Sequence, residues 1–169
     1  SGISNYPEAQ FDMVRLGIGL YGVDPSSTVQ SRLKHVSTLV TNIAQIRNIQ
    51  EGESVGYSCS FIAPKPMRIA TINIGYADGF ARSLSNGKGK VYALGNGHHA
   101  NPYCPVVGRV CMDMTMIDIT HLPHLREGDA VEIFGEHITI SQHAEMQGTI
   151  AYEVMTGISQ RVKRVYWNE

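Results

Sequence analysis

Short apolar runs separated by Gly, Pro or Asn recur along most of the chain. Their β-branched content and their length are typical of β-strands. The run at residues 35–49 is longer, and its alternation of apolar and polar positions is blurred. We predict strands at residues 35–49, 67–74, 90–94, 114–119 and 130–134, with one more short strand at 137–140.

Both ends of the chain carry weaker strand patterns. Residues 11–18 alternate imperfectly and lead into Gly17-Ile18-Gly19, which predicts a strand that runs into a turn with accessible backbone. Residues 161–167 predict a terminal strand. Turn-forming residues stand at 24–27, 86–89 and 95–97, and the first of these turns is the best candidate for a domain boundary.

The pattern changes near residue 140. Thr139 and Gln142 have the spacing of a capping box, in which a hydroxyl and a Gln side chain satisfy backbone N–H groups at the start of a helix. We therefore predict two short helices, at residues 141–147 and 149–155, on either side of Gly148. Many short strands with a small helical segment favour an all-β barrel or sandwich that carries a helical appendage.

The composition is that of a packed globular protein, since 43% of the 169 residues are hydrophobic and 17% are charged. The 14 basic residues are offset by 15 acidic ones, which argues against nucleic acid or an acidic membrane as a partner. No apolar run approaches the roughly 20 residues that span a bilayer, and the N-terminus has no signal-peptide pattern. We therefore expect a soluble, cytoplasmic protein.

Cysteine and histidine usage adds little chemistry. An odd number of cysteines without CxxC spacing favours reduced thiols. His98 and His99 are adjacent, and His121 and His124 flank a proline, but no Cys or carboxylate stands at ligand spacing beside them. We therefore predict no metal site. Because the chain opens at Ser1 without an initiator methionine, we expect it to be a piece of a longer polypeptide.

Several motifs stand in order along the chain and carry most of its chemistry. They are Arg15-Leu16-Gly17-Ile18-Gly19-Leu20-Tyr21-Gly22, Val55-Gly56-Tyr57-Ser58, Ile74-Gly75-Tyr76-Ala77-Asp78-Gly79, Gly108-Arg109-Val110-Cys111-Met112-Asp113-Met114, Ala151-Tyr152-Glu153 and Arg161-Val162-Lys163-Arg164-Val165-Tyr166. Together they resemble the C-terminal part of alanine racemase, a family of pyridoxal-phosphate enzymes. The resemblance covers nearly the whole chain in a consistent order, whereas no single motif would suffice.

That resemblance implies the architecture. The family joins an N-terminal (β/α)8 barrel to a C-terminal β domain, and its dimer builds each active site from both subunits. Residues 1–30 would then be a remnant of the pyridoxal-phosphate-binding barrel, including its last strand, together with the linker. Residues 31–169 would form the C-terminal domain, a mainly β, Greek-key-like barrel with a short helical segment near the C-terminus. A second racemase subunit is the implied partner.

Tyr57 is the catalytic residue that the resemblance implies. Racemisation at Cα needs a base on one face and an acid on the other, and the family uses a lysine and a tyrosine. A free phenol is only about 0.1% ionised at pH 7, which corresponds to about 4 kcal/mol, so the site must supply positive charge, donors or coupled proton transfer. On spacing alone, Tyr57 also fits an ordinary strand tyrosine that packs its ring and exposes its hydroxyl.

The resemblance places Arg15 opposite the pyridine nitrogen of the cofactor. A guanidinium does not readily give up a proton, so the ring nitrogen would stay largely unprotonated, the electron sink would weaken, and side reactions would be limited. Gly17 and Ile18 would donate backbone N–H groups to the phosphate, and Tyr152 a phenolic hydrogen bond. The structural alternatives, without a role in cofactor binding, are a salt bridge for Arg15, a simple turn at Gly17 and a core position for Tyr152.

The substrate would meet a different set of residues. The family places a methionine equivalent to Met112 against the substrate carboxylate through its backbone N–H, and Asp113 follows it. Cys111 and Met112 are otherwise ordinary core filler. The positions that match the corridor through which substrate enters are Tyr76, Arg82, Arg109 and Ile150; surface arginines with buried stems are the alternative there.

The lysine that anchors the cofactor in this family belongs to a barrel motif that these 169 residues lack, so the chain alone is expected to be inactive. The implied activity of the whole protein is interconversion of L- and D-alanine for cell-wall peptidoglycan precursors. The alternatives are a racemase of the same family for serine, lysine or another amino acid, and a non-catalytic β-barrel interaction module. The polypeptide before Ser1 would be a plain racemase barrel, or one fused behind a cell-wall ligase.

Overall fold

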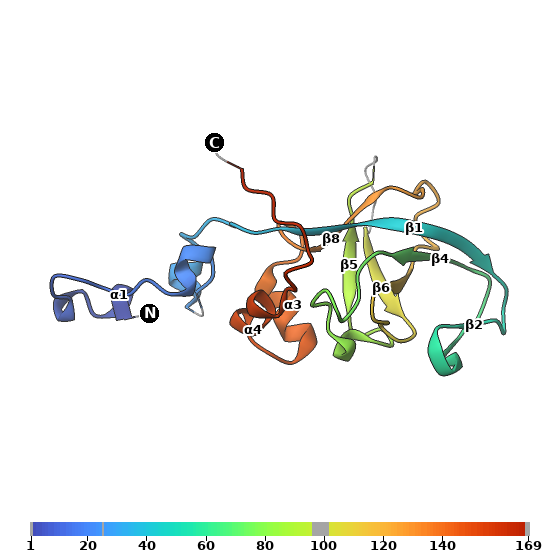
Figure 1. Ribbon diagram of the computed structural model, residues 1–169, viewed down its shortest axis with the longest axis horizontal. Helices are drawn as coiled ribbons and strands as arrows, with labels where there is room; N and C mark the ends of the chain where they lie inside the picture. Colours follow the sequence, from blue (N-terminus) through green and yellow to red (C-terminus); the bar gives the residue numbers. More distant parts are fainter. Residues whose placement is uncertain (1, 25, 96–101, 168–169) are drawn as a thin grey trace. The chain divides into compact units, whose positions relative to one another are not determined.

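The computed structural model describes residues 2–24, 26–95 and 102–167 (Figure 1). The chain forms two compact units, Ser1–Thr38 and Leu39–Glu169. The division between a remnant at 1–30 and a β domain from 31 onward stays a prediction about the longer protein. The adjacent histidines at 98 and 99, and the turn at 95–97 beyond Gly95, lie outside the described residues.

Among the described residues of the first unit, the regular elements are short helices: α1 (Gly2–Asn5), η1 (Pro7–Ala9), η2 (Ile18–Tyr21) and α2 (Ser27–Gln30). Residues 11–17, for which we predicted a strand, form no strand in this chain, and their interpretation as part of the last strand of a larger barrel stays a prediction. A strand is held by the backbone hydrogen bonds of a neighbour, and no described residue pairs with residues 11–17.

The second unit is a closed antiparallel barrel (Figure 1). Around the barrel the order is β1-β4-β7-β6-β5-β8, so β8 lies beside β5 and the last four strands form a Greek key. This confirms the predicted fold class. The strands are β1 (Leu39–Ile49), β4 (Met67–Ile72), β5 (Lys90–Ala93), β6 (Tyr103–Val107), β7 (Thr115–Asp118) and β8 (Ala130–Phe134).

Strand β1 closes the barrel because its two halves have different partners. Its first half pairs with β8, from Leu39 opposite Phe134, and its second half pairs with β4, up to Ile49 opposite Met67. Register shifts interrupt both ladders, between Leu39 and Val40 and between Ile43 and Gln45. A one-residue shift moves the following side chains to the other face, which explains the blurred alternation in the sequence.

The barrel interior is filled by branched aliphatic side chains, one or two from each strand. A second apolar cluster anchors the hairpin of β2 (Ser54–Val55) and β3 (Phe61–Ile62) to the end of the barrel. This cluster fixes the base of the loop that carries Tyr57. Its buried members are Val55, Ala63, Met67, Ile69 and Val107.

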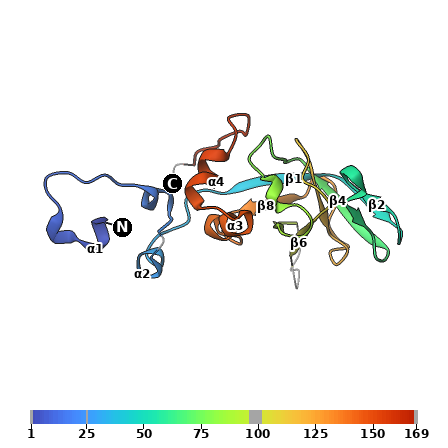
Figure 2. The ribbon, with the colours of Figure 1, turned by 90° about the horizontal axis from the view of Figure 1, so that it is seen from below.

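Two helices, α3 (Ile140–Gln147) and α4 (Ala151–Gly157), lie at the opposite end of the barrel from the hairpin (Figure 2). The predicted capping box is formed, since Gln142 N–H donates to the Thr139 hydroxyl and Thr139 N–H donates to the Gln142 side chain. Gly148 ends α3 with φ of 79°, which a glycine adopts at little cost. His143 of α3 is buried against Phe134 of β8, with ring centroids 5.7 Å apart.

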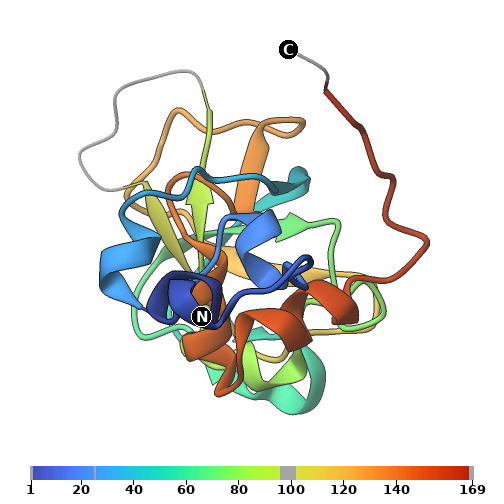
Figure 3. The same ribbon diagram turned by 90° about the vertical axis from the view of Figure 1, so that its left-hand side faces the viewer.

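Two other predicted strands were wrong. Residues 137–140 form a turn, because the Glu132 carboxylate accepts the His137 and Ile138 N–H groups and the next residue caps α3. Residues 161–167 extend away from α4 without a strand partner among the described residues (Figure 3), since the closed barrel offers no free edge.

Candidate active site

Tyr57 stands at the tip of the β2–β3 hairpin, in the turn η3 (Tyr57–Cys59). Its side chain is 70% exposed, so the hydroxyl is not sealed in apolar packing. The turn is unusual because Gly56, Ser58 and Cys59 all have positive φ. Two consecutive non-glycine residues in the left-handed region store strain, which the anchored hairpin below must offset. The turn therefore holds the phenol outward on a rigid base.

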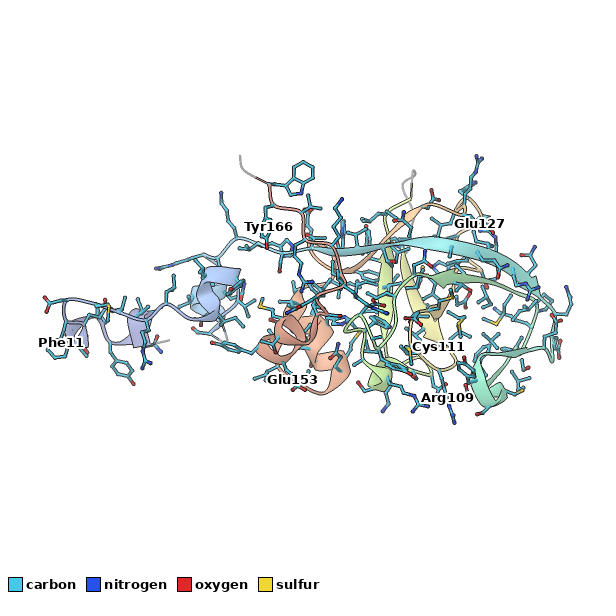
Figure 4. The ribbon with its side chains drawn as sticks, in the orientation of Figure 1. Phe11, Arg109, Cys111, Glu127, Glu153 and Tyr166 are labelled. Atoms are coloured by element: carbon cyan, nitrogen blue, oxygen red, sulfur yellow. The ribbon has the colours of Figure 1, made fainter. Side chains whose placement is uncertain are left out.

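The turn that carries Tyr57 lies directly against the start of the Gly108–Asp113 segment. A Cβ at Gly108, where φ is 65°, would lie 3.0 Å from the Val55 carbonyl oxygen. Arg109 donates from Nη1 to the Ser58 hydroxyl at 3.3 Å. Figure 4 labels Arg109 on the side of the barrel where this turn lies. A guanidinium is therefore held one residue from the candidate catalytic phenol.

The other end of that segment is held by the turn at residues 75–79. Tyr76 N–H donates to the Cys111 carbonyl and Ala77 N–H to the Met112 carbonyl, both at 3.0 Å. Cys111 N–H donates to the Met114 carbonyl. The Asp78 carboxylate accepts the Gly75 N–H at 2.9 Å, so it braces the turn. These bonds fix the path of the backbone through Met112.

The backbone N–H of Met112 takes no part in these hydrogen bonds. Both neighbouring carbonyls are occupied, yet among the described residues the Met112 N–H has no acceptor. Met112 is about half exposed as a residue. An unpaired donor on a fixed backbone is the kind of group that binds an anionic oxygen. The Asp113 carboxylate, by contrast, is engaged with Arg161 at 2.6 Å.

The residues predicted for the substrate corridor are all at least partly accessible. Tyr76 and Arg82 are exposed, and Arg109 is half-buried. Arg82 stands close enough to Cys111 for its charge to lower the pKa of that thiol, although burial raises this pKa more. Ile150 is exposed at the N-terminus of α4. The first three therefore belong to the loops around Met112, whereas Ile150 comes from the helical pair.

Tyr152 lies in the first turn of α4 and is 53% exposed, so it is not a core residue. In the first unit, Arg15 is exposed and Gly17 is the N-cap of η2, while the Ile18 side chain is buried. The roles predicted for these four residues stay predictions. They offer a guanidinium, two backbone amides and a phenol, which are donors suited to an anionic group.

No cluster of three or more His, Cys, Asp or Glu that could hold a metal occurs in the part of the chain that the structure describes. Each described helix is too short or too polar to cross a membrane.

The sequence of the β unit matches a known protein family. Residues 36–166 match the model of the alanine racemase C-terminal domain. The chain belongs to the alanine racemase family. It is 46% identical over 173 residues to alanine racemase 1 of Clostridium acetobutylicum, an alignment that covers 98% of this chain and 43% of that protein. The chain thus spans less than half the length of the curated racemases it matches.

Solved alanine racemases have the same fold. The enzyme of Clostridium difficile superposes with a TM-score of 0.86 at 38% identity, covering 98% of this chain and 43% of that one. The enzyme of Bartonella henselae, which carries covalently bound pyridoxal phosphate, gives a TM-score of 0.80 at 40% identity and covers 89% of this chain and 40% of that one.

The donor chemistry of this racemase domain fits part of a pyridoxal-phosphate site. In the first unit, the Arg15 guanidinium and the Gly17 and Ile18 amides are donors of the kinds that a ring nitrogen and a phosphate need. In the second unit, the Tyr152 phenol is another. A covalent anchor needs a lysine in a desolvated setting, and all five lysines are exposed. Lys90, for example, places its ammonium over the Tyr103 ring at 4.7 Å. The residues present therefore fit the non-covalent contacts and not the covalent one.

One functional feature was missed by sequence reasoning. Arg161 was assigned only to a terminal strand, yet it bridges the carboxylates of Asp78 and Asp113. These residues are separated from it by 83 and 48 positions in the sequence, so no local pattern reports the contact. The sequence signal that could have pointed to this bridge was the cluster of cations at residues 161–164.

Proposed function

We propose that this chain is the part of a pyridoxal-phosphate-dependent alanine racemase that supplies the tyrosine proton donor and acceptor. The whole protein would interconvert L- and D-alanine as a cytoplasmic homodimer that feeds peptidoglycan synthesis. The observation that supports this most directly is the exposed Tyr57 side chain, in a turn that Arg109 joins to the segment leading to Met112. An exposed phenol held by such a contact is suited to a substrate bound from outside the unit.

Tyr57 would hold or accept the proton at one face of the substrate Cα. A phenol does this at neutral pH only where positive charge favours its ionised form. The Arg109 guanidinium, which donates to the Ser58 hydroxyl, is a cation held at this turn. The strained left-handed backbone at Ser58 and Cys59 limits the directions in which the phenol can move, which favours one geometry of proton transfer.

Met112 would orient the substrate through its backbone N–H. A carboxylate oxygen of alanine accepts this hydrogen bond, and the bonded carbonyls of Cys111 and Met112 keep the donor in place. Because the side chain is not used, Met112→Ala should be tolerated better than changes that move the backbone. Tyr76, Arg82, Arg109 and Ile150 would line the way in, where two guanidiniums suit an amino-acid carboxylate.

Arg15, Gly17, Ile18 and Tyr152 would hold the cofactor without anchoring it. When bound, pyridoxal phosphate withdraws electrons from the substrate Cα and so makes its proton removable. Arg15 would face the ring nitrogen and keep it unprotonated, because a guanidinium holds its own proton. Gly17 and Ile18 N–H groups and the Tyr152 hydroxyl would bind the phosphate. The anchoring lysine and the second base would come from the rest of the protein.

The test is racemisation by the complete protein that contains this chain. It should convert L-alanine to D-alanine in the presence of pyridoxal phosphate, measured by chiral chromatography. The isolated 169-residue chain should form no D-alanine and, after borohydride reduction, carry no stoichiometric pyridoxyl group by intact mass. An inactive complete protein, or a stoichiometric adduct on the isolated chain, would contradict the proposal. A panel with serine and lysine would separate the related racemase activities.

A further inference from the structure

The C-terminal segment after α4 is fixed to the Gly75–Gly79 turn. Gly79 has φ of 109°, and a Cβ there would lie 2.7 Å from the Gly157 carbonyl oxygen. Ser159 N–H donates to the Asp78 carbonyl at 3.1 Å. Arg164 then donates to the carbonyls of Ile158 and Val162, which keeps the segment in a tight loop. The segment is therefore positioned on both sides of Arg161.

Arg161 uses that position to join two loops. Its Nε donates to Asp78 Oδ1 at 2.7 Å and its Nη2 donates to Asp113 Oδ1 at 2.6 Å. One edge of a guanidinium usually grips a single carboxylate with both nitrogens. Here the same edge is divided between two carboxylates from loops far apart in sequence. Asp78 also holds the Gly75 N–H, so the Gly75–Gly79 turn and the Met112–Asp113 loop share one cation.

The charges of Arg161, Asp78 and Asp113 matter because the proposed substrate carries a carboxylate. Asp113 directly follows Met112, whose N–H would bind the substrate carboxylate, and Asp113 is 56% exposed. An exposed carboxylate at that point repels an incoming carboxylate unless a cation is held beside it. The hydrogen bonds to Asp78 and Asp113 raise the pKa of Arg161 above its already high value, so the cation stays charged.

We propose that Arg161 is a positioning residue for substrate binding, which fixes the Met112 loop and offsets the Asp113 charge. This inference rests on the proposed function, since it concerns the carboxylate subsite of the same reaction. In this inference the Asp113 carboxylate binds Arg161, and the Met112 backbone N–H binds the substrate carboxylate. Single exposed ion pairs contribute little to stability, so the effect belongs to KM more than to folding.

The experiment uses the complete protein and removes the Arg161 charge. Arg161→Met should raise KM for L-alanine about tenfold while kcat changes by less than about threefold, because it leaves a carboxylate unbalanced near the substrate. Adding salt should lower the KM of this variant and leave that of the wild type nearly unchanged, because salt screens the repulsion. Arg47→Met, which removes an exposed cation on β1, should leave both constants unchanged and is the matched control.

Two further variants separate charge from structure. Arg161→Lys keeps the charge but can reach one carboxylate only, so its KM should rise less than that of Arg161→Met. In the double variant Arg161→Met/Asp113→Asn, KM should return at least halfway to the wild-type value on a logarithmic scale. An unchanged KM in Arg161→Met, equal losses in the Met and Lys variants, or no recovery in the double variant would overturn the inference. An inactive wild type would overturn the proposed function instead, so the two failures are distinguishable.

Discussion

The backbone of Gly75 lies so close to Met112 that a Cβ at position 75 would come within 2.3 Å of the Met112 carbonyl oxygen. It would also lie 2.4 Å from the Cys111 carbonyl oxygen. Contacts this short do not occur, so any side chain at 75 must push the two loops apart. The geometry of the proposed carboxylate subsite thus depends on the absence of a side chain one loop away.

Gly75→Ala should therefore weaken both folding and substrate binding. We expect a loss of about 1–3 kcal/mol in the free energy of unfolding, typical of overpacking against backbone. KM for L-alanine in the complete protein should rise at the same time. Gly157→Ala, where a Cβ meets nothing within 4 Å, is the control and should change neither quantity. Urea denaturation and steady-state kinetics measure the two effects, and wild-type values for Gly75→Ala would refute the dependence.

Tyr57→Phe should remove a proton-transfer group and little else. Because general acid–base groups contribute about 100- to 10,000-fold, kcat for racemisation should fall within that range, with KM changed only a few-fold. The phenyl ring keeps the packing of the turn, so the melting temperature should not move. Tyr166→Phe is the matched control, since Tyr166 is 87% exposed on the C-terminal segment. Full turnover by the Tyr57 variant would end the catalytic assignment.

Glu132 is expected to be the main stabiliser of the turn between β8 and α3. Its carboxylate is buried and accepts the N–H groups of His137 and Ile138 as well as His137 Nδ1 at 3.0 Å. Glu132→Ala leaves these donors without an acceptor and should cost about 2–4 kcal/mol of unfolding free energy. Glu132→Gln keeps one acceptor oxygen and should lose less. The exposed Glu136→Ala in the same turn is the control; equal stabilities in denaturant would contradict this assignment.

His143 should make the chain sensitive to acid. Burial between α3 and the barrel lowers the pKa of its imidazole from 6.5 to about 4. The unfolded chain therefore binds a proton first, so stability falls as pH drops from about 6.5 toward 4, by up to about 3 kcal/mol. His143→Leu keeps apolar contact with Phe80 and Phe134 and should flatten that dependence. Unfolding free energies from pH 4 to 7 measure it.

The exposed His124 provides the control for that experiment, because His124→Gln should keep the wild-type slope. Parallel pH dependences for the wild type and His143→Leu would show that another group is responsible. The expected direction is fixed by the sign of the shift: a buried histidine with a lowered pKa stabilises the fold at neutral pH relative to acid, and not the reverse.

Local signals explain which parts of the fold could be predicted. The strand at 130–134 and the Thr139 capping box depend on neighbouring residues, and both are formed. Strand β6 was missed because Pro105 stands inside it, and proline is rare within a ladder. The strands predicted at 11–18 and 161–167 have suitable patterns but no sheet to join, and a pattern alone does not report the presence of a neighbour.

In the candidate site too, local features could be predicted from the sequence, whereas contacts between distant segments could not. Tyr57 and Met112 were identified because short motifs surround them, and both prove accessible. The exposure of Tyr152 argues against the core position that was its structural alternative, while its predicted role at the phosphate stays a prediction. The bridge from Arg161 to two carboxylates depends on how the C-terminal segment meets two loops, which only the folded chain determines.

The pairing of Leu39 with Phe134 has a consequence for how the molecule is made. The first and last strands of the barrel are neighbours, so ring closure waits until residue 134 has been synthesised and released. Until then, β1 has one of its two ladders unmade and its apolar face open to water. Newly made chains therefore pass through a stage in which the partly formed barrel has an open strand edge, where pairing with another copy competes with closure.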